Sequence, residues 1–180
     1  GFLGDLARMP AAVLQKARLL FLNYPNNPTA AVASLEYLER VVAACRKHDI
    51  ILAYDNAYCD IVFDGYRAPS IFEVPGADEV AIEFFSLSKS FSMTGWRIGF
   101  AVGRAPFVGP LTQVKTYTDT GPFLAVQEAG AAVLDKAEEL TAPICAEIAR
   151  RRDAAVPALR AAGFQVELPK AAMYLWVGLP

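Results

Sequence analysis

The sequence contains few of the residues that build disulfide frameworks or zinc sites. Among 180 residues there are 3 cysteines, Cys45, Cys59 and Cys145, and 1 histidine, His48. An odd number of widely spaced cysteines, with no Cys-x-x-Cys pair, argues against both a disulfide framework and a zinc site. His48 follows Lys47 where a helix is expected to end. A cation is favourable at that position, so we assign His48 no catalytic role.

Long apolar runs and clusters of basic residues are also lacking. Hydrophobic residues make up 54% of the chain, but they occur in short runs, so no transmembrane helix is predicted. The formal net charge is -2, and no basic patch indicates binding to nucleic acid. The first residues lack the basic flank and apolar core of a signal peptide. We therefore expect a globular cytoplasmic protein with neither a membrane nor a nucleic acid as partner.

Short apolar runs predict four strands, at residues 19–22, 50–54, 80–85 and 98–102. The first two are typical of buried parallel strands, and the helix between them, which Ser34 can cap, has its apolar positions on one face. Strand, helix, strand in this order predicts a right-handed parallel crossover. Too little chain separates the third strand from the fourth for such a crossover. The fourth strand is therefore predicted to be antiparallel to the third.

The chain is predicted to be helical from Pro106 onward. Pro122 and Pro143 fit helix starts, whereas Pro110 and Pro157 should break or kink any helix that contains them.

Gly163 can end the last helix, after which residues 165–168 and 173–177 are typical of strands. This change of pattern predicts two domains. Residues 1–134 would belong to an α/β domain with a mainly parallel sheet, and residues 135–180 would begin a smaller α+β domain.

The polar segment between the third and fourth strands carries one lysine, Lys89, among small hydroxyl residues. A lysine in such a turn can lose solvation and become the neutral amine that forms a Schiff base with an aldehyde cofactor. Arg97 adds a fork-shaped cation that suits a phosphate group. The alternative interpretation is an ordinary solvated loop lysine. Trp96 is interpreted as a packing residue.

The spacing of these residues resembles a known family motif. Ser86-x-Ser88-Lys89, followed by Gly95-Trp96-Arg97-x-Gly99, is similar to the lysine motif of the class I/II pyridoxal-phosphate aminotransferases of fold type I. The resemblance covers nearly the whole chain and is strongest to LL-diaminopimelate aminotransferases and their near relatives. It implies the cofactor pyridoxal 5'-phosphate, with an amino acid and a 2-oxo acid as substrates, and a homodimer.

The resemblance also implies roles for individual residues. Lys89 would be the covalent anchor and the general acid/base, while Asp55 would face the pyridine nitrogen. Tyr58 and Asn27 would donate hydrogen bonds to the phenolate oxygen of the cofactor. Taken singly, an aspartate after a strand is often a cap, a tyrosine is often core, and an asparagine often shapes a turn. The residues expected at the phosphate are Ser86, Ser88 and Arg97.

Two departures from the family pattern matter. Ala30 stands where most members carry glycine. Members are also about twice as long, as two-domain enzymes are, so we expect a fragment without the N-terminal phosphate loop and without the C-terminal arginine that binds the substrate carboxylate. The alternatives are a lyase or synthase of the same fold that uses the same cofactor, and a non-catalytic truncated paralogue that persists as a folded or dimerising module.

Overall fold

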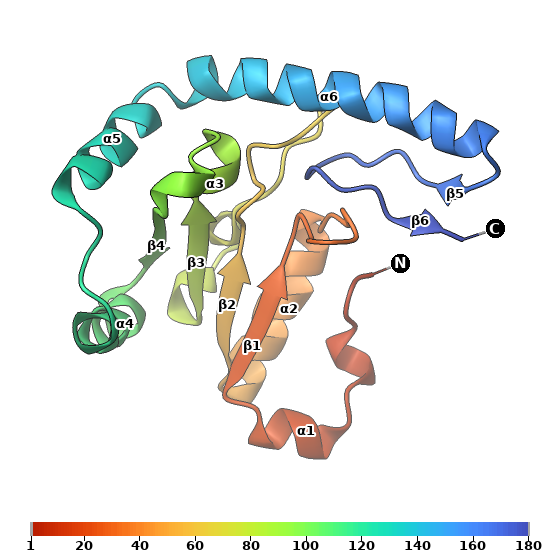
Figure 1. Cartoon of the computed structure of the whole chain (residues 1–180). Coiled ribbons are helices and arrows are strands. Elements are labelled where there is room, and N and C mark those ends of the chain that lie inside the picture. The colour runs from red at the N-terminus through yellow and green to blue at the C-terminus, as the bar shows by residue number, and fades with distance from the viewer. Residues whose placement is uncertain (1, 180) are drawn as a thin grey trace.

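The computed structural model describes residues 2–179, which are built around a four-stranded sheet (Figure 1). The strand order is β1-β2-β3-β4, with β1, β2 and β3 parallel and β4 antiparallel to β3. This confirms the predicted sheet, including its single antiparallel strand. The strands are β1 (Leu19–Asn23), β2 (Ile51–Asp55), β3 (Ala81–Ser86) and β4 (Gly99–Gly103).

Helices flank the sheet and make up most of the chain after β4 (Figure 1). The α-helices are α1 (Ala11–Lys16), α2 (Leu35–His48), α3 (Leu87–Ser90), α4 (Ala105–Thr118), α5 (Leu124–Leu134) and α6 (Ala137–Ala161). Short 3-10 helices occur at Leu6–Arg8, Ile71–Glu73, Ala77–Glu79 and Thr94–Trp96. Near the C-terminus, β5 (Gln165–Val166) and β6 (Val177–Gly178) form an antiparallel pair.

Helix α2 covers one face of the sheet and forms the main core with it. The hydroxyl of Ser34 accepts a hydrogen bond from the Tyr37 backbone N–H at 3.2 Å, which caps the helix as predicted. The buried side chains of α2 pack against Leu52 and Tyr54 of β2. Burial of each large apolar side chain stabilises the fold by about 1.5–3 kcal/mol, so this contact fixes the sheet. The α2 residues that are buried are Tyr37, Leu38, Val41, Val42 and Cys45.

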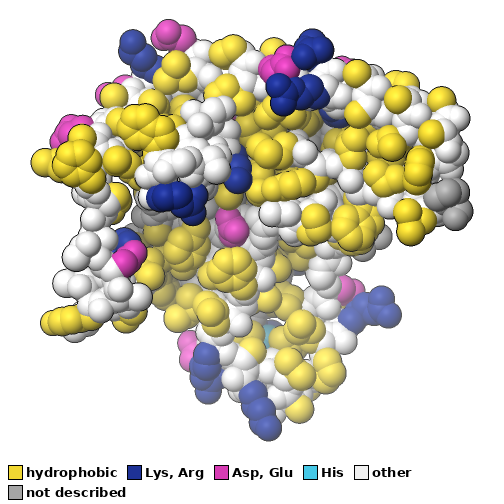
Figure 2. All heavy atoms as spheres, in the orientation of Figure 1, with side chains coloured by type: hydrophobic (Ala, Val, Ile, Leu, Met, Phe, Trp, Pro, Cys, Tyr) yellow, Lys and Arg dark blue, Asp and Glu magenta, His cyan; other side chains and the backbone are white. Residues whose placement is uncertain are grey.

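The opposite face of the sheet is largely uncovered within residues 2–179. Leu19 and Phe21 of β1 are 60% and 61% exposed, and Ile51 of β2 is 40% exposed. Figure 2 shows hydrophobic side chains gathered over the strands on this side. The expectation of buried strands is therefore wrong for β1, all of whose residues are exposed or half-buried, whereas it is confirmed for Leu52, Ala53 and Tyr54 of β2.

Helix α6 runs across the carboxyl ends of the strands (Figure 1) and contains two prolines. Pro143 lies inside α6 and does not start it, so that prediction is wrong; Pro157 also lies inside α6 and does not break it, while the alternative of a kink stays a prediction. Pro110 likewise lies inside α4. A proline removes one hydrogen bond from a helix, but these helices are mostly exposed. Water can therefore solvate the freed carbonyl, and the remaining helical bonds persist.

The predicted C-terminal strands are shorter than expected. Only residues 165–166 and 177–178 pair, so the predicted strand at residues 173–177 is wrong except at its end. The preceding residues pair elsewhere, since Ala171 forms an isolated bridge with Val62 of the loop after β2. Helix α6 begins close to the predicted domain junction, while the division into residues 1–134 and 135–180 stays a prediction.

Between residues 2 and 179, no helix is both long and apolar enough to cross a membrane. No group of three or more metal-ligating side chains occurs in the same part of the chain.

Candidate active site

Three adjacent strands deliver the predicted site residues to one edge of the sheet. Asn23 at the end of β1 pairs in register with Asp55 at the end of β2, which pairs in turn with Phe84 of β3. The chain passes from β3 directly into α3, which contains Lys89. Since ligands of open α/β sheets bind outside the carboxyl ends of the strands, the topology puts these residues where a ligand is expected.

The turn after β1 is fixed by Asn23. Its side-chain amide donates to the Asp55 carbonyl at 3.0 Å, and its Oδ1 accepts from the Asn27 backbone N–H at 2.8 Å. The side chain of Asn27 is thereby carried on a turn that is tied to the end of β2. Ala30 ends this turn with φ 57°, in the left-handed region that favours glycine, which accounts for the glycine expected there.

The carboxylate of Asp55 is partly buried and accepts a hydrogen bond from the Ala57 backbone N–H at 3.2 Å. Burial raises the pKa of Asp55, and this backbone hydrogen bond only partly opposes the rise. None of the ion pairs among residues 2–179 involves Asp55. A desolvated carboxylate without a cation is a suitable partner for a protonated ring nitrogen, so Asp55 fits the predicted role.

Tyr58 lies beyond Asp55 and is only 3% exposed. Its hydroxyl is hydrogen-bonded to the hydroxyl of Tyr174, 116 residues further along the chain. Burial, followed by the contact with Tyr174, raises the pKa of Tyr58, whereas a hydrogen bond from the Asn27 side chain lowers it. The structure thus brings Asn27 and Tyr58 together, as the prediction requires, and adds Tyr174, which the sequence analysis missed.

Helix α3 holds the serines around Lys89. The Ser86 hydroxyl caps the helix by accepting from the Ser88 backbone N–H at 3.3 Å. Ser88 is 6% exposed, and its carbonyl accepts from the Thr94 hydroxyl at 3.0 Å. Lys89 is half-buried. The turn is therefore tied to the following 3-10 helix, and this limits the positions that Lys89 can reach.

Arg97 occupies the return into β4 and has φ 53°, a conformation that residues other than glycine rarely adopt. Its guanidinium is exposed and donates to the Thr94 carbonyl at 3.0 Å. Its remaining donors are therefore available for a ligand. Trp96, interpreted from the sequence as packing, is 51% exposed, so that interpretation is wrong for the described residues.

Behind the site lies a buried polar cluster that the sequence analysis also missed. Glu83 of β3 is completely buried; its Oε1 accepts from Asn56 Nδ2 at 2.8 Å, and its Oε2 accepts from the Ser70 hydroxyl at 2.5 Å. Burial raises the pKa of Glu83. Asn56 directly follows Asp55, so the cluster connects β3 to the segment that carries the candidate site. A glutamate within an apolar strand was the available signal.

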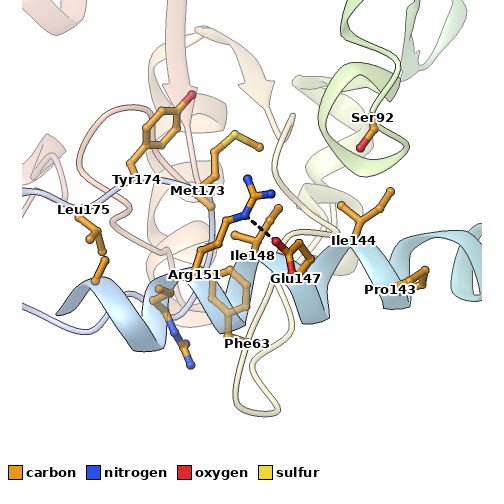
Figure 3. Close-up of a pocket in the computed structure, with 13 residues that line it drawn as sticks. Phe63, Ser92, Pro143, Ile144, Glu147, Ile148, Arg151, Met173, Tyr174 and Leu175 are labelled. Atoms are coloured by element: carbon orange, nitrogen blue, oxygen red, sulfur yellow. Dashed lines mark hydrogen bonds and ion pairs between the residues drawn. The ribbon is translucent and has the colours of Figure 1, made fainter. Parts of the chain in front are cut away.

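A cavity of about 630 Å³ lies between α6 and residues 172–175 (Figure 3). It is mainly apolar, and Glu147 and Arg151 pair across one side of it at 2.7 Å. None of the predicted site residues lines this cavity. Tyr174 and Ala172, which both pack against Tyr58, line the cavity, as does Ser92, whose backbone N–H donates to the Lys89 carbonyl at 3.5 Å, so the cavity adjoins the candidate site.

The sequence and structure define the class of protein to which this chain belongs. The model of the family "Aminotransferase class I and II" matches residues 1–180, and the chain therefore belongs to this family. The family expected from the lysine motif is confirmed.

The individual relatives agree with this. The chain is 48% identical, over 179 residues, to LL-diaminopimelate aminotransferase 2 of Trichormus variabilis; the matched region covers 99% of this chain and 46% of the relative. It is 45% identical to the glutamate-pyruvate aminotransferase AlaC of Escherichia coli, over 99% of this chain and 43% of AlaC. Among solved structures, a probable N-succinyldiaminopimelate aminotransferase from Thermus thermophilus has a TM-score of 0.92 at 39% identity, covering 99% of this chain and 48% of that one.

The chain spans slightly less than half the length of the curated relatives that it matches.

Proposed function

We propose that this chain's site serves pyridoxal-phosphate-dependent transfer of an amino group between an amino acid and a 2-oxo acid. The observation that carries the proposal is the arrangement at the strand ends. Asp55, a partly buried carboxylate with no ion pair among residues 2–179, lies on the same sheet edge as Lys89 and the Asn27–Tyr58 pair. These side chains supply an amine, a partner for a ring nitrogen and donors for a phenolate.

The bound cofactor would supply an aldehyde that captures amines and a ring that accepts electrons from the substrate Cα. Lys89 would hold the cofactor covalently, and its amine, once freed by substrate, would move the proton at the substrate Cα. Asp55 would keep the ring nitrogen protonated. Tyr58 and Asn27 would donate to the phenolate oxygen.

The phosphate would be held by Ser86, Ser88 and Arg97. Two hydroxyls and a guanidinium give it charge-assisted hydrogen bonds.

By its similarity to LL-diaminopimelate aminotransferases, the substrate proposed for the whole protein is an amino acid of that class. We also propose a cytoplasmic homodimer. The apolar sheet face that is exposed at Leu19, Phe21 and Ile51 supports association with further protein surface.

The proposal is tested by adding pyridoxal phosphate to the purified chain, reducing it with borohydride and locating the modified lysine by mass spectrometry. Lys89 is expected to be the main modified residue, and Lys89→Ala should abolish the modification at this site. Lys115→Ala, which removes an exposed lysine paired with Asp119, is the matched control and should change nothing at Lys89. Asp55→Asn should weaken cofactor binding, because it removes the charge facing the ring.

Equal modification of Lys89 and Lys115 would contradict the proposal. For the isolated 180 residues we expect weak binding and no measurable transamination. The N-terminal phosphate loop expected from the family pattern is not among these residues. Loss of two of its charge-assisted contacts with the phosphate, each worth about 1.5–3 kcal/mol, weakens cofactor binding by about a hundredfold or more. Robust turnover with an amino acid and 2-oxoglutarate would show the last expectation to be wrong.

A further inference from the structure

The contact between Tyr58 and Tyr174 joins the candidate site to the C-terminal part of the chain. The two hydroxyls share a hydrogen bond, and the rings meet edge to face with centroids 5.5 Å apart and an interplanar angle of 73°. Ala30 and Ala172 complete this small apolar cluster. Tyr58 is therefore enclosed on one side by a residue that no sequence motif connects to it.

The position of Tyr174 is fixed by backbone pairing with the loop that follows Tyr58. The Ala172 N–H donates to the Ile61 carbonyl at 2.8 Å, and the Phe63 N–H donates to the Lys170 carbonyl at 2.9 Å. These bonds lie close in sequence to both tyrosines. The two rings are thus carried on paired segments, and their relative position does not depend on the side-chain contact alone.

Arg152 of α6 holds the same paired segments together. Its guanidinium donates to the Pro169 carbonyl at 3.1 Å and to the Asp64 carboxylate at 2.7 Å, so it contacts both partners of the pairing. The guanidinium also lies over the Phe63 ring, 4.6 Å from its centroid. Because the Arg152 side chain is only 5% exposed and contacts several groups, it holds the two paired segments in one relative position.

A phenol has one proton to donate and two lone pairs that accept. If Tyr58 donated its proton to Tyr174, none would remain for a cofactor oxygen. If Tyr174 donates, the Tyr58 proton is free to point into the site, and each hydrogen bond in the chain polarises the next. The Asn27 side chain lowers the pKa of Tyr58 by hydrogen bonding. With Asn27 and Tyr174 both as donors to the Tyr58 oxygen, the Tyr58 proton would be left for a ligand.

Resting on the proposed function, we propose that Tyr174 is a positioning residue for Tyr58: it donates to the Tyr58 hydroxyl and directs the Tyr58 proton to the phenolate oxygen of the cofactor. The titratable groups that face Tyr58 are Tyr174 itself and Asp55. Tyr174 touches no reacting atom and acts only through Tyr58. The C-terminal segment thereby contributes to a site whose other predicted residues all come from residues 27–97.

The first test uses the protein without cofactor. All tyrosines are labelled with 13C at Cζ, and the Tyr58 resonance is assigned from Tyr58→Phe. Tyr174→Phe keeps the ring contact but removes the hydroxyl, and it is expected to shift the Tyr58 resonance. Tyr66→Phe is the matched control, because Tyr66 is a half-buried tyrosine whose hydroxyl donates to the Ala33 carbonyl at 3.3 Å. The control should leave the Tyr58 resonance in place.

The second test uses saturating pyridoxal phosphate and follows the visible absorbance of the bound cofactor against pH. A donor to the phenolate favours its deprotonated, more negative state, so loss of a donor raises the midpoint of the titration. Tyr174→Phe should raise the midpoint by less than Tyr58→Phe does, and should weaken cofactor affinity about three- to tenfold. Tyr66→Phe should match the wild type in both measurements.

The possible failures are distinguishable. If Tyr174→Phe leaves both the Tyr58 resonance and the absorbance midpoint unchanged while Lys89 still binds the cofactor, this inference is overturned and the proposed function stands. If the wild-type chain fails to bind the cofactor at Lys89, the proposed function is overturned and this inference falls with it, before any variant is compared.

Discussion

Glu83 offers a quantitative test of how the buried polar cluster supports the sheet edge. In Glu83→Ala the amide of Asn56 keeps only the Pro69 carbonyl at 3.4 Å and loses its acceptor at 2.8 Å, the hydroxyl of Ser70 loses its acceptor at 2.5 Å, and a cavity remains in a completely buried position. Each buried donor left without a partner costs about 1–3 kcal/mol. We expect the free energy of unfolding to fall by about 2–5 kcal/mol. Glu83→Gln keeps the shape; its amide oxygen can accept from Asn56 while its amide N–H donates to the Ser70 hydroxyl oxygen, so it should stay within about 1 kcal/mol of the wild type.

The wild type and Glu83→Gln should also differ in how the free energy of unfolding depends on pH. Burial raises the pKa of Glu83 in the folded chain, whereas in the unfolded chain the group titrates near its ordinary value of about 4.3. Between these two pKa values the folded state binds more protons than the unfolded state, so the contribution of Glu83 to stability falls as pH rises through this window. Glu83→Gln has no such proton. The wild type should therefore lose stability relative to Glu83→Gln, by at most about 1.4 kcal/mol per pH unit.

Urea unfolding followed by circular dichroism, from pH 4.5 upward, measures both effects. The alanine and glutamine variants share the loss of the ionisable group, so the difference between them reports the lost contacts together with the cavity. Equal stability of the two variants would refute the role assigned to the cluster. Parallel stability curves for the wild type and Glu83→Gln across the pH range would refute the argument from the raised pKa.

Two further substitutions test the packing around the site, each by urea unfolding. Arg152→Ala removes a guanidinium that donates hydrogen bonds to Asp64, Asp153 and the Pro169 carbonyl. It should lower the free energy of unfolding by about 2–4 kcal/mol, and Arg152→Lys should lower it less. A change below about 0.5 kcal/mol in Arg152→Ala would contradict the role of Arg152. Gly99→Ala places a Cβ 2.5 Å from the Phe85 carbonyl oxygen, so it should cost about 1–3 kcal/mol. Gly109→Ala in α4, where the Cβ would meet nothing within 4 Å, should instead be neutral or stabilising, and similar losses in both variants would rule out the close contact as the cause.

Features that depend on neighbouring residues could be predicted from the sequence. The hydroxyl of Ser34 caps α2, and the apolar positions of that helix face the core. The short connection between β3 and β4 left no room for a crossover helix, so the antiparallel pairing followed from chain length alone. The order of the elements likewise put Asp55 and Lys89 on one sheet edge, because parallel strands end on the same side.

Features that depend on contacts between distant segments were decided only by the tertiary structure. The prolines of α4 and α6 remain inside helices because the surroundings of those helices tolerate a lost hydrogen bond, which a local rule cannot assess. The segment at residues 173–177 is apolar enough for a strand, yet its preceding residues pair with the loop after β2.

The candidate site divides in the same way. Lys89, the serines beside it and Arg97 lie within one turn and its flanks. They form a local pattern, so the sequence by itself determined which residues of this segment are candidates for the site. Tyr174 reaches Tyr58 across 116 residues, and Glu83 bonds Asn56 across 27. A hydrogen bond between side chains requires the two groups to approach within about 3 Å with suitable orientation, and only the folded chain sets that distance.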